Sequence, residues 1–166
     1  KDKGVDPIAF VPGRGEIQVK MEKQGVRCVS FKCPPVRPWR FIGFYLLQRE
    51  LAELFEQERL DIVHVNGARC MLYAGPAARR ADLPCVWHVR VTERDWFLDR
   101  IRAGYASAVI ANSKAVAGSL VKGGVSARCV DVIYNGFRRE DCDSVLPADL
   151  PACLNVTVRP VVLAAG

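Results

Sequence analysis

Polar or basic side chains end four short apolar runs of this 166-residue chain. His88 and Arg90 close one run, and the other three end in Asn66-Gly67, Asn112-Ser113 and Asn135-Gly136. Imidazole, amide and hydroxyl groups could hold a polar ligand through hydrogen bonds. Because open parallel α/β sheets bind ligands outside the carboxyl ends of their strands, the four run ends predict one rim of a polar cleft.

Two of these run ends could also hold an anion. Arg90, two residues after His88, could bind an acidic group bidentately, or it could pair at the surface with Glu93 or Asp95. The turn from Asn66 through Gly67 to Arg69 would offer unpaired backbone N–H groups to an anion, although such turns also serve as plain connections. We expect His64 to face the core.

Strands that alternate with helices position these residues. The patterns predict strands over 8–11, 26–31, 61–65, 86–91, 108–111 and 128–134, and helices over 16–24, 41–59, 69–81, 95–106 and 113–122. We expect Gly25 to stop the first helix, Asn112 or Ser113 to cap the last one, and Asn135-Gly136 to form a tight turn. The alternation indicates right-handed βαβ units and therefore an α/β fold with a parallel sheet.

Bulk composition narrows the class of protein. Half of the residues are hydrophobic, which argues against a disordered chain. The net charge of +6 permits an anionic partner, but no dense basic run with interleaved aromatics occurs, so we expect no nucleic acid. The seven cysteines form no Cys-x-x-Cys pair, so we expect no metal and mostly buried, reduced thiols. Neither a signal peptide nor a membrane-length apolar run occurs, so we expect a cytoplasmic location.

A loop and the start of the following helix mix basic and aromatic residues. Arg37, Trp39 and Arg40 could lie on an anionic membrane surface or contact an acceptor, which makes the protein peripheral at the inner face of the membrane. Phe44 and Tyr45 could instead be core contacts of the helix, and we favour that reading for Phe44.

The four runs, taken in order, resemble motifs of the N-terminal domain of GT-B glycosyltransferases of the retaining family 4. They stand here as Asp61 to Asn66, Pro84 to His88, Ile110 to Ser113 and Val132 to Phe137. The resemblance covers residues 8–141 and the last apolar run. Asn66 stands where many relatives have a second histidine, and Arg138 stands where an aspartate is common.

The resemblance implies a Rossmann-like parallel sheet with helices on both faces, which is half of a GT-B fold. Residues 1–141 would form the acceptor-side domain without its first strand, 142–158 a linker or frayed helix, and 159–166 the first strand of an absent donor domain. Losing a central strand would leave open backbone edges in the sheet. We therefore expect Pro160 to Ala165 to fill the gap or to pair with another molecule, which would make a dimer.

The resemblance also implies a reaction: a sugar moves from a nucleotide-diphosphate sugar to a glycan or lipid-linked acceptor, with retention and without a further cofactor. His88 would contact the donor sugar or support the departing diphosphate. Asn112 and Ser113 would lie at the cleft floor, and Asn135 and Gly136 near the acceptor. This chain alone would be inactive. The alternatives are a GT-B sugar epimerase or phosphorylase, and a non-catalytic Rossmann binding module.

Overall fold

The computed structural model describes residues 4–13, 15–32, 41–91 and 96–136. The chain divides into two compact units, Lys1–Tyr134 and Asn135–Gly166. The described secondary structure lies in the first unit. No helix in the described ranges is long and apolar enough to cross a membrane.

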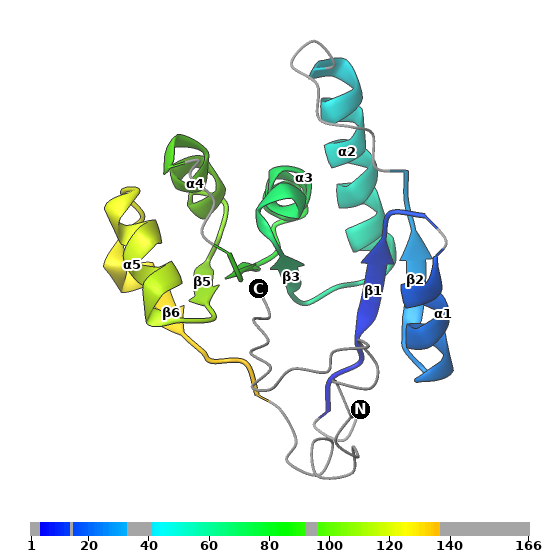
Figure 1. The fold of residues 1–166 in the computed structure, drawn as a ribbon. Helices are drawn as coiled ribbons and strands as arrows, with labels where there is room; N and C mark the ends of the chain where they lie inside the picture. The colour runs from blue at the N-terminus through cyan, green and yellow to red at the C-terminus, as the bar shows by residue number, and fades with distance from the viewer. Residues whose placement is uncertain (1–3, 14, 33–40, 92–95, 137–166) are drawn as a thin grey trace, which may run out of the picture. The chain divides into compact units, whose positions relative to one another are not determined.

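A two-stranded parallel sheet opens the first unit (Figure 1). Its elements are β1 (Ile8–Val11), α1 (Glu16–Lys23) and β2 (Arg27–Ser30), and α2 (Phe41–Gln57) follows. Ile8 lies opposite Arg27 in the register of the two strands. Gly25 takes φ +76° after the cap residue Gln24 of α1, which confirms the expected stop because glycine adopts positive φ without steric cost.

A second parallel sheet of four strands, in the order β3-β4-β5-β6, carries the rest of the unit. The strands are β3 (Val63–Asn66), β4 (Cys85–Val89), β5 (Ala108–Ala111) and β6 (Val130–Val132). The helices between them are α3 (Ala68–Arg80), α4 (Trp96–Ala103) and α5 (Lys114–Lys122). The predicted alternation is confirmed, although Ala127–Cys129 forms a 3₁₀ turn where we expected the last strand to begin.

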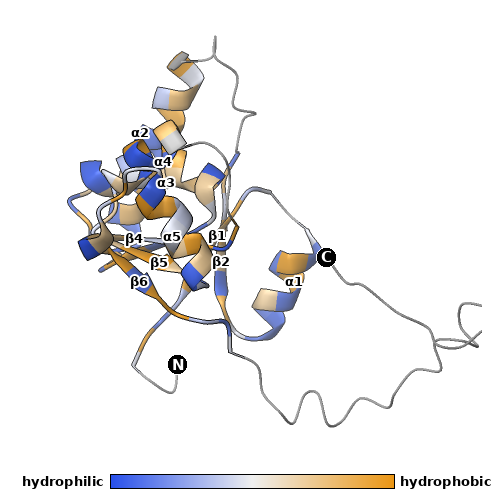
Figure 2. Cartoon of the chain, turned by 60° about the vertical axis from the view of Figure 1, so that its left-hand side comes forward, coloured by the Kyte–Doolittle hydropathy of each residue, from blue (hydrophilic) through white to orange (hydrophobic). Residues whose placement is uncertain are grey.

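Helices lie on both sides of the strands, as expected. Figure 1 shows α3, α4 and α5 side by side over the four-stranded sheet. Figure 2 shows α1 on the other side of the strands. Right-handed crossovers give this arrangement when the chain winds outward in two directions from the middle of a sheet. The fold is therefore of the α/β, Rossmann-like class.

The core lies between the four-stranded sheet and its helices. The largest fully buried side chains include Trp87 and Val109 on the strands and Met71 on α3. Phe10 of β1 packs edge-on against Phe55 of α2, with ring centroids 5.2 Å apart, so the two-stranded sheet joins the same core.

The strands form two sheets where we expected one. Among the described residues, β1 pairs only with β2, and β3 pairs only with β4. One edge of β1 and one edge of β3 are therefore unpaired there. The segment Pro160 to Ala165, which we expected to fill this gap, lies outside the described residues.

Candidate functional site

The carboxyl ends of β3, β4, β5 and β6 meet at one edge of the sheet. The backbone N–H of Gly67 donates to the His88 carbonyl at 3.0 Å, and that of Asn112 donates to the Val89 carbonyl at 3.2 Å. The Ile133 N–H donates to the Ala111 carbonyl at 3.0 Å. These bonds continue the parallel ladder past the strand ends, so the side chains that follow the strands share one edge of the sheet.

One face of this sheet carries a row of side chains near the strand ends. In the register of the strands, Asn66 lies opposite His88, His88 opposite Ile110, and Ile110 opposite Asp131. The alternate positions, such as Trp87, are buried, and α3 and α5 pack against these strands. Because side chains alternate between the faces of a strand, the row lies on the face that these helices leave uncovered.

His88 is half-buried in this row and has a second imidazole beside it. The rings of His64 and His88 lie 5.5 Å apart between centroids. The Nε2 atom of His88 is buried and has no hydrogen-bond partner among the described residues. Burial and the neighbouring charges of His64 and Arg90 lower the pKa of His88 below its ordinary value of 6.5. The ring is therefore neutral near pH 7, with a nitrogen that a ligand could bind.

The expectation that His64 faces the core is wrong. His64 is exposed and shares the uncovered face with His88, while its neighbours Val63 and Val65 are buried. The alternation of apolar and polar residues from Val63 to Asn66 is the signal that could have placed it. The structure thereby adds an imidazole to the candidate site.

Arg90 lies just past the end of β4 and is exposed. We expected it on the same face as His88 if the strand continued, but β4 ends at Val89. The positive charge of Arg90 nevertheless contributes to the lowered pKa of His88. The alternative partners Glu93 and Asp95 lie outside the described residues. Arg90 therefore brings a cation to the edge of the sheet where His88 lies.

Asn112 and Ser113 divide the expected roles between them. The Ser113 Oγ accepts a hydrogen bond from the Val116 N–H at 3.2 Å, so Ser113 is the cap of α5. The Asn112 Nδ2 donates to the Arg90 carbonyl at 3.0 Å. The Oδ1 of Asn112 is buried, with no hydrogen-bond partner in the described part of the chain. Asn112 therefore holds the backbone after β4 and keeps one acceptor for a ligand.

The turn from β3 into α3 needs a glycine. Gly67 has φ +99° and precedes the first residue of α3, where no side chain caps the helix. Its own N–H is bonded to His88, so it is not available to an anion as we expected. Arg69 is exposed in the first turn of α3. The positive end of α3 and the Arg69 side chain thus lie beside the carboxyl end of β3.

The remaining predicted site residues are Asn135 and Gly136 after β6, and Arg37, Trp39 and Arg40 before α2. Asn135 and Gly136 are exposed and belong to the second unit. Gly136 does not take a positive φ, and the expected tight turn extends into residue 137, which lies outside the described residues. Arg37, Trp39 and Arg40 lie outside the described residues.

The cysteines are less buried than we expected. Cys85 is buried, and burial raises the pKa of its thiol to about 11. Cys70 and Cys129 are exposed, so the expectation of mostly buried thiols is wrong for both of them. Cys70 follows the polar turn into α3, and Cys129 ends a short 3₁₀ turn. Within the described ranges, no three His, Cys, Asp or Glu side chains gather where they could hold a metal ion.

The sequence matches a known protein family. The model of the family described as Glycosyltransferase Family 4 matches residues 1–141. No curated protein matches the sequence of this chain.

Solved structures share the fold at low sequence identity. HepE of Anabaena, solved with UDP and glucose, has 20% identity and a TM-score of 0.62 over 89% of this chain and 42% of its own. A glycosyltransferase of Rickettsia africae has 17% identity and a TM-score of 0.70, over 95% and 43% of the two chains. A UDP-N-acetylglucosamine 2-epimerase of Rickettsia bellii has 18% identity and a TM-score of 0.59, over 94% and 45%. The chain thus spans less than half the length of these proteins.

Proposed function

Because the chain belongs to Glycosyltransferase Family 4 and has the fold of GT-B glycosyltransferases, we propose that it forms the acceptor-side wall of an enzyme that transfers a sugar from a nucleotide-diphosphate sugar, with retention. The acceptor is a glycan or a lipid-linked glycan, and the donor is the only small molecule that the reaction requires. The other wall of the cleft belongs to the complete enzyme, and this chain alone is inactive.

One observation carries the proposal: two buried polar atoms at the strand ends lack a hydrogen-bond partner among the described residues. They are the Nε2 of His88 and the Oδ1 of Asn112. An unpaired buried polar atom costs about 1–3 kcal/mol, so a ligand that binds such an atom recovers that cost. The His88 Nε2 belongs to an imidazole, and the Asn112 Oδ1 can only accept a hydrogen bond. The two atoms suit the hydroxyl groups of a sugar, which both donate and accept hydrogen bonds.

The lowered pKa of His88 favours one of its two expected roles. A neutral imidazole neutralises no phosphate charge, but it exchanges a hydrogen bond with a sugar hydroxyl. We therefore assign His88 to the donor sugar and not to the departing diphosphate. Asn112 fixes the backbone beside it through the Arg90 carbonyl.

Cationic groups beside His88 suit the leaving group. A nucleotide diphosphate gains negative charge as the glycosidic bond breaks, and fixed positive groups stabilise this charge in the transition state. Arg90, Arg69 and the uncapped N-terminus of α3 supply such groups at the carboxyl ends of β3 and β4. Asn66, opposite His88 in the register, orients a further hydroxyl.

The acceptor side completes the proposal. Asn135 and Gly136 contact the acceptor, and Arg37, Trp39 and Arg40 hold the enzyme at the inner face of a membrane, where a lipid-linked acceptor would be presented. The protein is otherwise cytoplasmic and binds no nucleic acid.

Turnover of the full-length enzyme tests the proposal. Donor hydrolysis or transfer is measured with UDP-glucose and UDP-N-acetylglucosamine, with and without an acceptor glycan. His88→Ala is expected to lower kcat by about a hundredfold, because a hydrogen bond made in the transition state is lost. His64→Ala is the matched comparison: its ring lies one row further from the strand ends, so we expect a loss of about fivefold or less.

Equal losses in the two variants would contradict the role of His88, provided that circular dichroism shows both proteins folded. Lack of binding when the full-length protein is titrated with nucleotide sugars would overturn the enzyme proposal. That result favours a non-catalytic binding module.

A sugar epimerase is the second candidate, because an epimerase shares this fold at a TM-score of 0.59. An epimerase converts its nucleotide sugar without an acceptor. Product formation from UDP-N-acetylglucosamine alone, with no dependence on added glycan, would favour this candidate over a transferase.

A further inference from the structure

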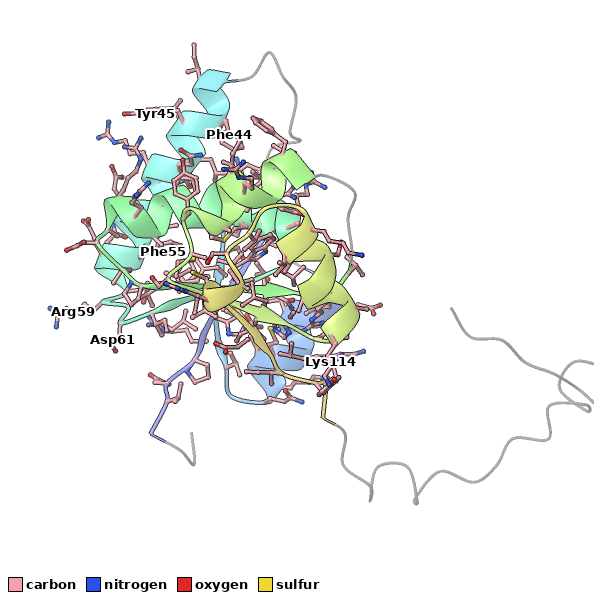
Figure 3. The ribbon with its side chains drawn as sticks, turned by 90° about the vertical axis from the view of Figure 1, so that its left-hand side faces the viewer. Phe44, Tyr45, Phe55, Arg59, Asp61 and Lys114 are labelled. Atoms are coloured by element: carbon pink, nitrogen blue, oxygen red, sulfur yellow. The ribbon has the colours of Figure 1, made fainter. Side chains whose placement is uncertain are left out.

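Lys114 is a cation that the proposed function leaves without a role. It is the first residue of α5, directly after the cap residue Ser113, and it is exposed. In Figure 3, Asp61, which precedes β3, and Lys114, which follows β5, lie at opposite ends of the strands. Lys114 therefore lies at the carboxyl edge of the sheet, where His88 and Asn112 also lie.

The first turn of α5 is an unfavourable place for a lysine. The unpaired backbone N–H groups give the start of a helix a partial positive charge, so a carboxylate stabilises it and a cation destabilises it. Glu16 begins α1 in the favourable way, whereas the first turn of α5 holds no acidic residue. Because proteins depart from such local preferences mainly at functional sites, the position of Lys114 points to a role in binding.

The charged side chains that follow the strands at this edge all have the same sign. The described residues 67–69, 90–91, 112–114 and 133–136 include three basic side chains and no acidic one; the basic residues are Arg69, Arg90 and Lys114. All three are exposed, and none of them forms an ion pair with another described residue. Asp131 lies within β6 and not after it. Positive charges that the protein does not neutralise attract an anionic ligand.

Strand spacing separates Lys114 from the cations assigned to the leaving group. Arg69 follows β3 and Arg90 follows β4, whereas Lys114 follows β5. Neighbouring strands lie about 4.8 Å apart, so the backbones of β3 and β5 are about 10 Å apart. A diphosphate between Arg69 and Arg90 therefore leaves Lys114 for a second anionic group. β5 pairs with β6, after which the proposed acceptor residues Asn135 and Gly136 follow in the chain.

We propose that Lys114 binds a negatively charged group of the acceptor, so that the enzyme transfers its sugar to an acidic glycan. The charged group is a carboxylate or a phosphate, since an ammonium group binds either one through charge-assisted hydrogen bonds. The inference rests on the proposed function, because it names the class of acceptor that the transferase uses. Lys114 is a specificity-determining residue, which holds the acceptor and takes no part in breaking the donor bond.

Titration of the full-length protein with three small probes tests this role. The probes are glucuronate, glucose 1-phosphate and glucose, and the protein is first saturated with UDP so that the cations of the leaving-group site are occupied. We expect at least one of the two acids to bind about tenfold more tightly than glucose, because it makes a hydrogen bond between charged groups. Which acid binds distinguishes a carboxylate from a phosphate. Lys114→Gln is expected to remove the difference between that acid and glucose.

Lys122→Gln is the matched control, because Lys122 is an exposed lysine in the last turn of the same helix. This substitution removes the same charge from the protein, and it is expected to leave the affinity for the acids unchanged. Equal weakening by the two substitutions would overturn the proposal, because the net charge of the protein, and not the position of Lys114, would then attract the acid.

Thermal denaturation without ligand separates a role in binding from a role in folding. Lys114→Gln removes a cation from the start of α5, so we expect Tm to rise by about 1–4 °C. Lys122→Gln removes a favourable cation from the end of the helix, so we expect Tm to fall by a similar amount. A lower Tm for Lys114→Gln would overturn the proposal, because it would show that Lys114 pairs with a carboxylate of the protein itself.

The affinity for UDP distinguishes this inference from the proposed function. Failure of the unmodified protein to bind UDP would overturn the proposed function. Intact UDP binding without a preference for either acid over glucose would overturn the role of Lys114 alone. We expect Lys114→Gln to bind UDP with the Kd of the unmodified protein. Weaker UDP binding in this variant would also overturn the inference, because Lys114 would then belong to the site of the leaving group.

Discussion

His88 and Asn112 show why single residues at the strand ends matter. Each holds a buried polar atom with no hydrogen-bond partner among the described residues. The backbone around these atoms is nevertheless fixed, because the Asn112 amide donates to the Arg90 carbonyl and the Gly67 N–H donates to the His88 carbonyl. A folded protein keeps few such atoms, and those it keeps are commonly explained by function or by a bound partner. Both lie at the edge of a parallel sheet where ligands bind in this class of fold.

The titration of His88 is a prediction at this scale. Its pKa lies below the ordinary value of 6.5, so just below that pH the folded chain binds fewer protons than the unfolded chain. The free energy of unfolding therefore falls as the pH drops through this window. Arg90→Gln removes one of the positive charges that lower the pKa of His88. We therefore expect the midpoint of the His88 ring signals in a proton NMR titration to shift to higher pH.

Arg128→Gln is the control for this titration. Arg128 is an exposed arginine that is not among the groups that lower the pKa of His88. An equal shift in both variants would mean that net charge, and not the proximity of Arg90, lowers the pKa of His88.

The cap of α5 carries a prediction at the scale of elements. Ser113→Ala removes the acceptor of the Val116 N–H, and we expect the free energy of unfolding to fall by about 1 kcal/mol. Ser126→Ala is matched to it, because Ser126 precedes the 3₁₀ turn without a side-chain cap bond. Its change should stay within about 0.5 kcal/mol. Urea denaturation measures both, and similar losses would contradict the capping role.

Two helical glycines predict changes of opposite sign. A Cβ at Gly75 of α3 would lie 2.9 Å from both Met71 Cε and Tyr105 Cβ, so Gly75→Ala is expected to lower the free energy of unfolding by about 1–3 kcal/mol. A Cβ at Gly118 of α5 meets nothing within 4 Å. Gly118→Ala should raise stability by about 0.5–1 kcal/mol, because alanine favours helix. Thermal denaturation tests the pair, and stabilisation by both would show that α3 has room at Gly75.

At the scale of the whole molecule, the edges of β1 and β3 that have no partner among the described residues matter most. The Val63 and Gly67 N–H groups donate to the Pro84 and His88 carbonyls of the β4 segment, so the alternate His64 amide points to the unpaired edge. The Val11 carbonyl of β1 accepts a hydrogen bond from the Phe31 N–H, so Val11 faces β2. By the same alternation, the backbone N–H of Phe10 points away from β2, to the other edge of β1. A strand edge without a partner attracts a further strand.

Hydrogen exchange tests whether the segment Pro160 to Ala165 fills this gap. We expect the amides of His64 and Phe10 to be protected in the full chain and to exchange at least about tenfold faster in a chain that ends at residue 158. The paired amide of Val65 should stay protected in both. Unchanged protection after truncation would contradict the prediction. Protection that grows with protein concentration would indicate pairing with a second copy instead.

The sequence determined the features that depend on local pattern. The periods of apolar residues predicted the order of strands and helices, because side chains repeat every two residues in strands and about every 3.6 residues in helices. Run ends placed His88 and Asn112 at strand ends, and the positions of glycine predicted the end of α1. The motifs also predicted the family, since each motif is a strand end together with the residue that follows it.

Only the tertiary structure decided what depends on register and burial. The pairing of β3 with β4 brought His64 beside His88. The fold also buried the Nε2 atom of His88, and nothing in the sequence distinguished this imidazole nitrogen from the others. The packing of α2 on α3 turned Phe44 inward and left Tyr45 outside. The division into two sheets likewise followed from contacts between distant segments. The local sequence pattern determines on which side of a helix or strand a side chain lies. Which residues that side chain contacts depends on how the distant parts of the chain pack together.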